Sequence, residues 1–451
     1  MRAVVLGGGI AGLYSARVLA SAGHSVDLFE ASDRLGGLIQ PATLGSVTFD
    51  IGAEAFAVSR PDALALIADL GLETQLVEPA NSEARILANG RAFKIPHGFL
   101  GIPSNLDSAD LLEAIGAEGV SEAKRLDAAA WNVEPGGTLG QLVSQRLGGA
   151  VLENLVTPVV AGVHASHPSL LEADVVAPGL FAKAKQLGSL VAAAAEIRAS
   201  AARPGAAVAG LNGGMHGLIR ALRVELERLG VNVHLGVAAD SVAAGESGYR
   251  VTFANGQSAV YLVAVLATPP AVSAKLLADA PELAQPLGAL RAVDVTVVAL
   301  IAQNRYIGRA PLGSGVLVAP GEPGVTAKAS THATAKWDWL HQALGEDKHL
   351  IRLSYGRDGE APKASEDLLR VARQDAAALF WLDAVDVIDA VIQEWPGSLI
   401  QARVGHRAAL NALAAAQQKF PNLAIVGAGL GGNGITGILA KAKEQLSRIG
   451  D

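Results

Sequence analysis

Short apolar runs alternate with alanine-rich stretches along the chain, and this pattern predicts a mixed α/β fold. Residues 2–6 form an apolar run typical of a buried parallel strand, residues 13–22 have a helical pattern, and residues 25–29 form a second strand. Similar elements follow much later in the chain. They are the helix 218–229 and the strands 231–235, 249–253, 259–266 and 423–426.

Two long segments interrupt these elements. Residues 86–204 carry alanine- and leucine-rich helical patterns. Residues 291–390 alternate strands, at 293–302 and 349–354, with a helix at 365–382. The chain of 451 residues is long enough for two or three domains with a large core.

A glycine-rich turn after the first strand fits the G-x-G-x-x-G pattern. Its first glycine permits a tight turn, its second lets backbone approach a pyrophosphate, and its third lets the following helix pack on the strand. The helix N-terminus then offers amides to the phosphates. A glutamate at the end of the second strand, about 20 residues on, can accept hydrogen bonds from a ribose. The residues expected to contact a dinucleotide are Gly7, Gly9, Ile10, Ala11, Gly12 and Glu30.

The residues after the second strand indicate which dinucleotide binds. Glu30, Arg34, Gly36 and Gly37 fit E-x-x-x-R-x-G-G, and this segment resembles the flavin amine oxidase superfamily, whose members hold FAD. The resemblance implies that Ala31 adjoins the cofactor and that Arg34 meets phosphate charge. It also implies that the two glycines let backbone pass close to FAD.

The fold class that follows is α/β and α+β, with the cofactor domain built from three separate parts of the chain. A substrate-binding sheet domain and a helical insert complete it. We expect the Rossmann-like FAD-binding domain at 1–60, 205–290 and 391–451, the substrate-binding domain at 61–85 and 291–390, and the mainly helical insert domain at 86–204.

Composition narrows the range of functions. The chain has no cysteine, which excludes disulfides and thiolate chemistry, and its net charge of −7 gives no sign of a nucleic-acid partner. No metal site is expected, because no set of residues stands at ligand spacing. No apolar run approaches the roughly 20 residues of a membrane span, although peripheral membrane contact stays open. Because the first strand starts at residue 2, leaving no room for a signal peptide, we expect a cytoplasmic protein.

Five short segments, in matching order, resemble the protoporphyrinogen and coproporphyrinogen III oxidase family. With the flavin motif at the N-terminus, the resemblance extends over nearly the whole chain. The chain departs from the family pattern at Ile400 and Ala402, where the family usually has proline and tyrosine, and in its glycine-rich segment 427–434. The resembling segments are PHGFLGIP at 96–103, the helical signature within 138–165, LNGGM at 211–215, ATP at 267–269, and the W-P…G-H block within 395–406.

The resemblance implies an oxidase of haem biosynthesis that converts a porphyrinogen to a porphyrin. Six electrons would pass by way of non-covalent FAD to O2, giving peroxide. Coproporphyrinogen III is favoured over protoporphyrinogen IX, because a chain without a hydrophobic anchor suits the more soluble substrate. A transient contact with a chelatase that receives the product stays open.

The same resemblance places the segment before the C-terminal helix under the flavin, where amides stabilise negative charge near N1 and O2. Val237, after a strand, would set its backbone amide and carbonyl against the adenine. His406 is expected to be structural. The C-terminal residues expected at the flavin are Gly427, Asn433, Gly434 and Ile435.

The substrate is expected to contact Arg60, Gly162, His164 and Lys336. A guanidinium matches a carboxylate with two hydrogen bonds, so Arg60 suits a propionate, and Lys336 could hold one as well. For both side chains a purely structural role is equally consistent with the sequence.

Three other classes compete with a porphyrinogen oxidase. An amine oxidase of the same superfamily would flank the flavin with aromatic side chains, but no Trp or Tyr follows Trp395. A carotenoid desaturase would need an aromatic tunnel for a long hydrocarbon. A flavin-binding scaffold or chaperone without turnover is only weakly excluded.

Overall fold

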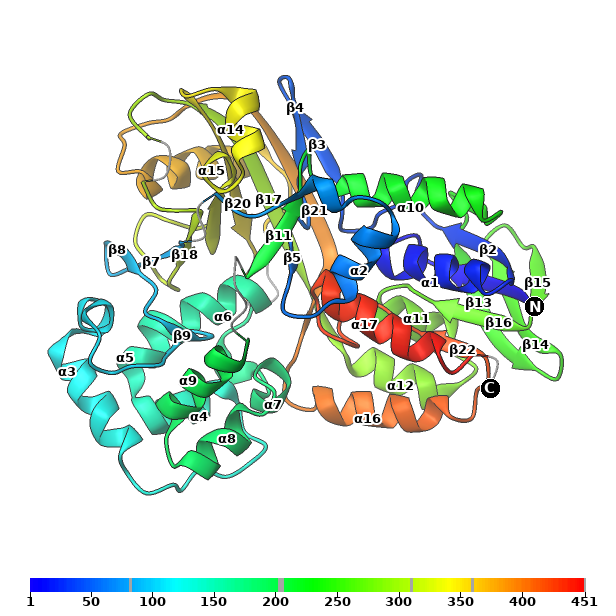
Figure 1. Cartoon of the computed structure of the whole chain (residues 1–451), viewed down its shortest axis with the longest axis horizontal. Helices are drawn as coiled ribbons and strands as arrows, with labels where there is room; N and C mark the ends of the chain where they lie inside the picture. Colours follow the sequence, from blue (N-terminus) through cyan, green and yellow to red (C-terminus); the bar gives the residue numbers. More distant parts are fainter. Residues whose placement is uncertain (81–82, 202–206, 309–310, 358–360, 450–451) are drawn as a thin grey trace.

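A parallel sheet in the order β12-β2-β1-β16-β22 forms the centre of one half of the protein (Figure 1). The computed structural model describes residues 1–80, 83–201, 207–308, 311–357 and 361–449. The sheet confirms the expected Rossmann-like α/β fold. Its strands are β1 (Arg2–Leu6), β2 (Ser25–Glu30), β12 (Asn232–Leu235), β16 (Val263–Leu266) and β22 (Leu423–Ile425).

Both faces of this sheet are covered, which is why its strands read as continuous apolar runs. Val5 and Val265 face a core shared with three helices, and Val4 and Leu266 face a second core on the other side. The first core contains α1 (Ile10–Ser21), α10 (His216–Arg228) and α17 (Ile435–Leu446). The second contains α11 (Pro270–Leu276), α12 (Pro281–Ala289), α16 (His406–Gln417), β13 (Ala239–Gly245), β14 (Gly248–Phe253) and β15 (Ser258–Tyr261).

The expectation of one strand at 259–266 is wrong. The chain turns at Leu262, whose amide donates to the Arg2 carbonyl at 3.0 Å. Residues before Leu262 pair antiparallel with β14, and residues after it pair parallel with β1. One apolar stretch therefore serves two sheets, because its two halves have different neighbours.

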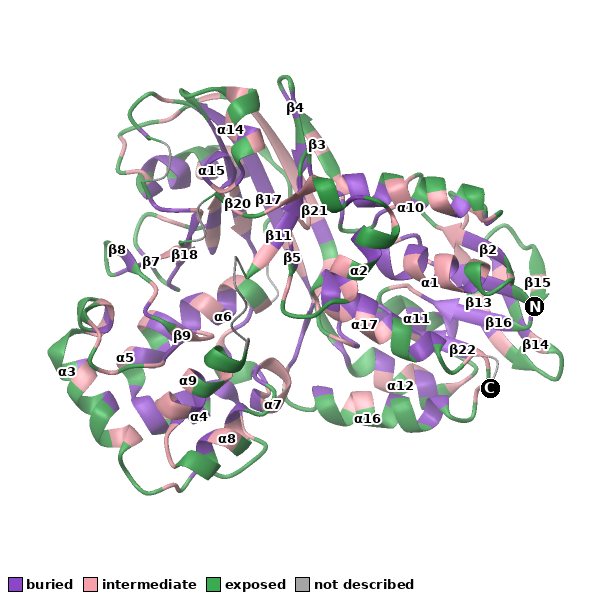
Figure 2. Cartoon of the chain, in the orientation of Figure 1, coloured by how far each residue is buried: buried purple, intermediate pink, exposed green. Residues whose placement is uncertain are grey.

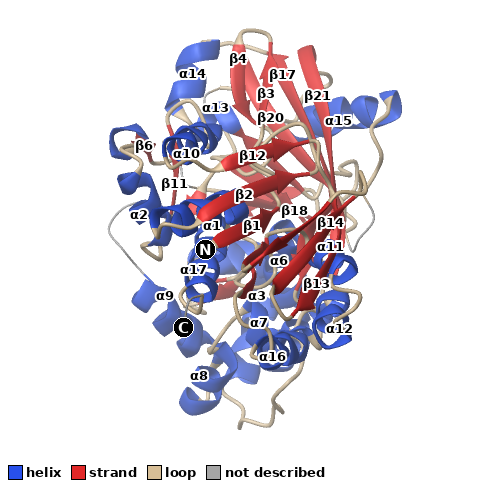
Figure 3. Ribbon diagram, turned by 90° about the vertical axis from the view of Figure 1, so that its right-hand side faces the viewer, coloured by secondary structure: helices blue, strands red, loops and turns tan. Residues whose placement is uncertain are grey.

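A second, mixed sheet has the order β21-β17-β20-β19-β18-β7-β8. Its neighbours are antiparallel except β18 and β7, which run parallel. Its strands are β7 (Arg85–Ala88), β8 (Arg91–Lys94), β17 (Arg291–Gln303), β18 (Gly315–Val318), β19 (Ala329–His332), β20 (Lys348–Tyr355) and β21 (Asp386–Gln401). Figure 2 shows that β16 and β17 are largely buried, and in Figure 3 the strands run through the middle of the molecule with most helices around them.

Different elements cover the two faces of this second sheet. One face packs on α15 (Glu366–Leu379), which ends before the expected residue 382 because Trp381 has a φ of +53°. The other face packs on β3 (Pro41–Leu44), β4 (Val47–Asp50), α13 (Ala333–Lys336) and α14 (Asp338–Leu344). A small sheet of β5 (Phe56–Ala57), β11 (Val208–Leu211) and β6 (Leu76–Val77) lies between the two large sheets (Figure 1).

One buried arginine links the ends of helices in the insert. Arg146 donates to the carbonyls of Asp127, Ala129, Ala130 and Gly188 at 2.6 to 3.3 Å, and so joins the ends of α3 and α8. The elements of this region are α3 (Ala109–Asp127), α4 (Leu139–Leu147), α5 (Gly149–Val151), the π-helix η2 (Leu152–Val156), α6 (Thr157–His164), η3 (Pro168–Leu170), α7 (Ala173–Val176), α8 (Leu180–Leu187), α9 (Leu190–Ala201), β9 (Gly98–Phe99) and β10 (Ile102–Pro103).

Three features bear on the expected domain boundaries. Strands β7 and β8 fall within 86–204 almost entirely, yet they belong to the second large sheet. Helix α2 (Asp62–Asp69), followed by η1 (Glu73–Gln75), packs on α17, and β21 runs across position 390/391. The boundary at 204/205 lies outside the described residues. The division into domains stays a prediction.

Among the described helices, none is long and apolar enough to cross a membrane.

Candidate functional site

The described residues enclose a cavity of about 440 Å³ at one edge of the parallel sheet. Its wall includes Gly7 after β1, Glu30 at the end of β2, Ala267 after β16 and Gly427 after β22. All four positions lie at the carboxyl ends of parallel strands, where open α/β sheets bind their ligands.

Most residues expected at the cofactor line this cavity. The exceptions are Gly12, Arg34 and Gly434. The cavity also takes in Ala238, Thr268, Pro396 and Ser398, which carried no expected role. The expected residues found in its wall are Gly7, Gly9, Ile10, Ala11, Glu30, Ala31, Gly36, Gly37, Val237, Gly427, Asn433 and Ile435.

Two glycines of the first turn, Gly7 and Gly12, are there because backbone atoms approach too closely for a side chain. Gly7 has a φ of +108°, and a Cβ on it would lie 2.6 Å from the Ala267 carbonyl oxygen. A Cβ on Gly12 would lie 1.8 Å from the Gly7 carbonyl oxygen, so Gly12 packs α1 on the turn without lining the cavity. A Cβ on Gly9 would meet only Gly37 Cα, at 4.0 Å.

Two helices begin at the cavity wall with a glycine as N-cap. Gly9 precedes α1 and Gly434 precedes α17, and neither has a side chain to bond the first-turn amides. Ile10, Ala11 and Ile435, from those first turns, line the cavity. Unpaired amides at a helix start carry partial positive charge, so both ends favour negatively charged groups in the cavity.

Three donors hold the Glu30 carboxylate at the wall. The Gly8 amide donates to Oε2 at 2.6 Å, and the amide and hydroxyl of Ser32 donate to Oε1 at 2.8 Å. Its carboxylate therefore fixes the glycine turn to the end of β2. The expected contact with a ribose stays a prediction.

Arg34 and Val237 have backbone partners. The Arg34 guanidinium donates twice to the Gly37 carbonyl at 3.1 Å, so it supports the loop beside the cavity. The Val237 amide donates to the Glu30 carbonyl at 3.0 Å, which leaves only its carbonyl for an adenine. The expected contact of Val237 with an adenine stays a prediction.

Asn433 and His406 hold the glycine-rich segment 427–434. Asn433 Nδ2 donates to the Ile400 carbonyl at 2.8 Å, and the Ile400 amide donates to Asn433 Oδ1 at 3.3 Å. His406 Nε2 donates to the Gly429 carbonyl at 3.0 Å, as expected of a structural histidine, and burial is the main cause that lowers its pKa. A Cβ on Gly429 would lie 2.6 Å from the Ile400 side chain, which accounts for glycine there.

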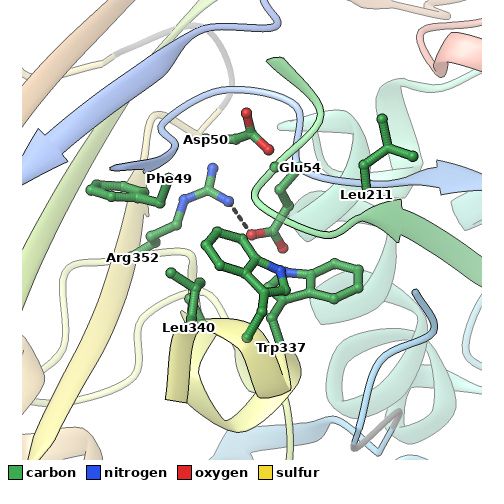
Figure 4. A pocket seen from close by; sticks show the side chains of 10 residues that line it. Phe49, Asp50, Glu54, Leu211, Trp337, Leu340 and Arg352 are labelled. Carbon is green, nitrogen blue, oxygen red and sulfur yellow. Dashed lines mark hydrogen bonds and ion pairs between the residues drawn. The ribbon is translucent and has the colours of Figure 1, made fainter. Parts of the chain in front are cut away.

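A buried ion cluster forms where the segment after β4 meets α13 and β20, and Figure 4 shows Glu54 and Arg352 of this cluster. The Glu54 carboxylate accepts from Lys336 Nζ at 2.6 Å and from Arg352 at 2.5 Å. Arg352 also donates to the carbonyls of Ile51 and Gly52. Lys336 and Arg352 overcome the effect of burial and hold the pKa of Glu54 at about 2.

A second carboxylate lines the same small hollow, whose volume is about 10 Å³. Asp50 accepts from the amides of Met215 and His216 and from His216 Nδ1 at 2.5 to 3.1 Å, and so holds the start of α10. Neither Glu54 nor Arg352 was assigned a role from the sequence. The available signal was the single charged residue at position 352 within a run of otherwise apolar strand residues.

The four residues expected at the substrate lie on three separate segments, and none lines the 440 Å³ cavity. Lys336 is held by Glu54, and the exposed Arg60 lies 3.6 Å from Asp62. Gly162 and His164 are on α6, where burial lowers the pKa of His164. Their contacts with a substrate stay predictions.

Gly162 packs α6 against the second sheet. A Cβ on Gly162 would lie 2.6 Å from the Leu317 side chain on β18. The turn after α6 is held from β21, because Gln401 Nε2 donates to the Ala165 carbonyl at 2.7 Å. Residues from two motifs that are far apart in sequence therefore meet at the junction of the insert with the sheets.

Comparison with known proteins decides the family. The family described as flavin containing amine oxidoreductase matches residues 10–436. The chain belongs to this family. Members of this family carry a flavin, so the cofactor of this protein is a flavin.

Relatives over the full length carry more specific names. The coproporphyrinogen III oxidase of Mycobacterium tuberculosis H37Rv is 31% identical, and the alignment covers 99% of this chain and 96% of that protein. The coproporphyrinogen III oxidase of Staphylococcus aureus is 24% identical, with 99% and 98% covered. A provisionally named protoporphyrinogen oxidase from Exiguobacterium sp. 255-15 has a crystal structure that superposes with a TM-score of 0.85 at 25% identity, covering 99% and 98%. The resemblance to porphyrinogen oxidases is confirmed.

Proposed function

We propose that the protein is an FAD-dependent oxidase that converts coproporphyrinogen III to coproporphyrin III in haem biosynthesis, with O2 as acceptor and H2O2 as the second product. The observation that carries the proposal is the full-length likeness to relatives named coproporphyrinogen III oxidase, at 31% identity over 99% of this chain. The cavity at the edge of the parallel sheet gives such a reaction its flavin site.

The residues of the cavity fit FAD. The glycine-capped start of α1 suits a pyrophosphate, Glu30 suits a ribose, and the glycine-capped start of α17 suits the flavin ring. The C-terminal segment has no Cys, His or Tyr that could bond a flavin covalently. We therefore expect non-covalent FAD that acid or heat releases, and a flavin retained on the denatured chain would contradict this.

FAD, when bound, supplies the capacity to take two electrons at a time and to pass them to O2. The chain's own part is to bind and orient the porphyrinogen. Burial keeps His164 neutral at physiological pH by lowering its pKa, so it is a poor cation for a propionate. The macrocycle can lose protons from its own N–H groups, and we assign no protein base.

Oxygen uptake by the purified protein under air tests the proposal. Coproporphyrinogen III should give fluorescent coproporphyrin III with about three peroxides per porphyrin, from the six-electron count. A polyamine serves as the control substrate and should give no uptake. Rapid uptake with the polyamine and no porphyrin would make the protein an amine oxidase.

Protoporphyrinogen IX is the second candidate substrate. The structural likeness to the provisionally named protoporphyrinogen oxidase favours it, with a TM-score of 0.85 at 25% identity. Parallel assays of the two porphyrinogens, compared by kcat/KM, separate the candidates.

Fractionation of the native cells should find the protein in the cytoplasm, and recovery in the membrane fraction would favour the less soluble substrate, protoporphyrinogen IX.

A further inference from the structure

We infer that Asn433 is a positioning residue that fixes the start of α17 against the flavin cavity; the inference rests on the flavin site of the proposed function. Its carboxamide bonds both backbone groups of Ile400, with Nδ2 donating at 2.8 Å and Oδ1 accepting at 3.3 Å. The side chain therefore ties the segment before α17 to the end of β21.

This clamp needs a side chain that donates and accepts at once. A carboxamide does both, whereas leucine, which has a similar shape, does neither. The clamp also needs an N–H at position 400, which proline lacks. Both bonds therefore depend on the side chain at position 433, whereas at position 400 only proline would remove one of them.

The clamp lies directly beside the helix start. Gly434 follows Asn433 and caps α17 with a φ of −80° and a ψ of 150°, and Ile435 is the first helical residue. Asn433 and Ile435 line the cavity. The position of residue 433 therefore determines where the first-turn amides of α17, with their partial positive charge, meet the cavity.

A separate contact holds the other end of this segment. His406 Nε2 donates to the Gly429 carbonyl at 3.0 Å, and Gly429 has a φ of +83° with the Ile400 side chain directly over its Cα. The segment 429–433 is tied at both ends to residues 400–406. Loss of the Asn433 bonds should therefore release only the end that adjoins α17.

The expected consequence is electrostatic as well as structural. Fixed amide dipoles stabilise negative charge in a water-poor site only while they are held in place. A reduced flavin carries more negative charge than an oxidised one. Loss of the clamp should therefore weaken flavin binding and should weaken the reduced form more than the oxidised form.

The test compares Asn433→Leu with Gln417→Leu. Gln417 makes the same kind of bond at the other end of α17, where Nε2 donates to the Leu423 carbonyl at 3.1 Å and to Gln445 Oε1 at 2.7 Å. Both variants lose carboxamide hydrogen bonds and should lower the unfolding midpoint. Only Asn433→Leu should raise the dissociation constant of FAD, by about tenfold. It should also lower, by about tenfold, the ratio of the affinity for reduced flavin to the affinity for oxidised flavin. This change lowers the reduction potential of the bound flavin by about 30 mV for a two-electron couple.

Ile400→Pro provides a second route to the clamp. It removes the N–H and keeps the carbonyl, so the flavin potential should shift in the same direction as in Asn433→Leu, by a smaller amount. Equal shifts of the flavin potential in Asn433→Leu and Gln417→Leu would overturn the inference. An unchanged flavin potential and FAD affinity in both Asn433→Leu and Ile400→Pro would overturn it too. A wild-type protein that binds no flavin would overturn the proposed function first and the inference with it.

Discussion

The buried Glu54 cluster offers the sharpest test of how the segment after β4 is joined to the second large sheet. Glu54→Gln keeps the size and shape of the side chain and removes its negative charge. Lys336 and Arg352 would then lose the carboxylate that both of them contact, and Figure 4 shows the contact with Arg352. Breaking a buried ion pair from one side is strongly destabilising, because it leaves a charge without compensation.

The pKa of Glu54 gives the magnitude. Its lowering from 4.5 to about 2 corresponds to about 3 kcal/mol of stabilisation of the carboxylate form. Measured losses from broken buried pairs lie at about 3–5 kcal/mol, in agreement. For a chain of this length we expect the unfolding midpoint to fall by about 3–6 °C.

The pH dependence follows from the direction of the shift. A carboxylate whose pKa is lower in the folded state stabilises the fold fully above its unfolded value of 4.5, and this stabilisation is lost as pH falls through about 2. The difference between wild type and Glu54→Gln should therefore be constant above about pH 5. It should shrink steadily below pH 4.5.

The assay is the unfolding midpoint of the flavin-loaded protein at several pH values between 7 and 3, with Glu444→Gln as control. Glu444 forms an exposed pair with Lys441 at 2.7 Å, so its loss should cost at most about 1 kcal/mol. A second comparison uses Lys336→Met, which should lower the midpoint and leave the KM for a porphyrinogen unchanged. Equal small effects of Glu54→Gln and Glu444→Gln would refute the reasoning. A raised KM in Lys336→Met with an unchanged midpoint would return Lys336 to the substrate.

Four further changes test the remaining assignments. Gly12→Ala should abolish flavin absorbance, because its Cβ would lie 1.8 Å from the Gly7 carbonyl oxygen; normal FAD content would contradict this. Glu30→Ala should weaken FAD binding by about 1.5–3 kcal/mol, measured as the dissociation constant, with little change in saturated turnover. Arg146→Met should lower the free energy of unfolding by about 3 kcal/mol, because it leaves buried carbonyls without a donor. Arg60→Ala should raise the KM for a porphyrinogen and leave FAD content unchanged; an unchanged KM would remove Arg60 from the substrate site.

Local signals predicted the cofactor half of the fold well. The strand expected at 2–6 is β1, and the helix expected at 218–229 is α10 within two residues at either end. These elements could be predicted because each carries its own apolar period and its own glycine turns. The run 259–266 misled because both halves are apolar, and only pairing with distant strands separates them.

Strands β7 and β8 show the same limit in the other half. They lie next to helical patterns in the sequence, and they join the second sheet through a parallel contact with β18, more than 200 residues away in the chain. Nothing in the sequence around β7 and β8 indicates a partner so far away, so the spacing of apolar residues could not assign these strands to the second sheet. The partner strand, which becomes adjacent only on folding, decides their place.

The flavin motif predicted which backbone lines the cavity and not what its side chains bond. Gly7, Gly9 and Gly37 line the cavity as the spacing predicted, and close backbone approach accounts for the glycine at position 7. Arg34 instead bonds the Gly37 carbonyl, and Asn433 bonds Ile400. A motif fixes the path of the chain, whereas the partner of a polar side chain depends on whichever unpaired group the fold brings near.

Lys336 illustrates why that difference matters for function. From the sequence, a lysine beside a tryptophan at the end of a strand suits a propionate as well as a structural ion pair. The structure sets its ammonium 2.6 Å from Glu54, which also contacts Arg352 and lies 282 residues from Lys336 in the chain. A buried cation must have a partner, and here the protein provides one before any substrate arrives. A porphyrinogen carboxylate at Lys336 would have to share the ammonium with Glu54, whereas Arg60 lies exposed at the surface beside Asp62, so Arg60 is the less constrained of the two cations that the sequence indicated. The contacts of both side chains with a propionate stay predictions.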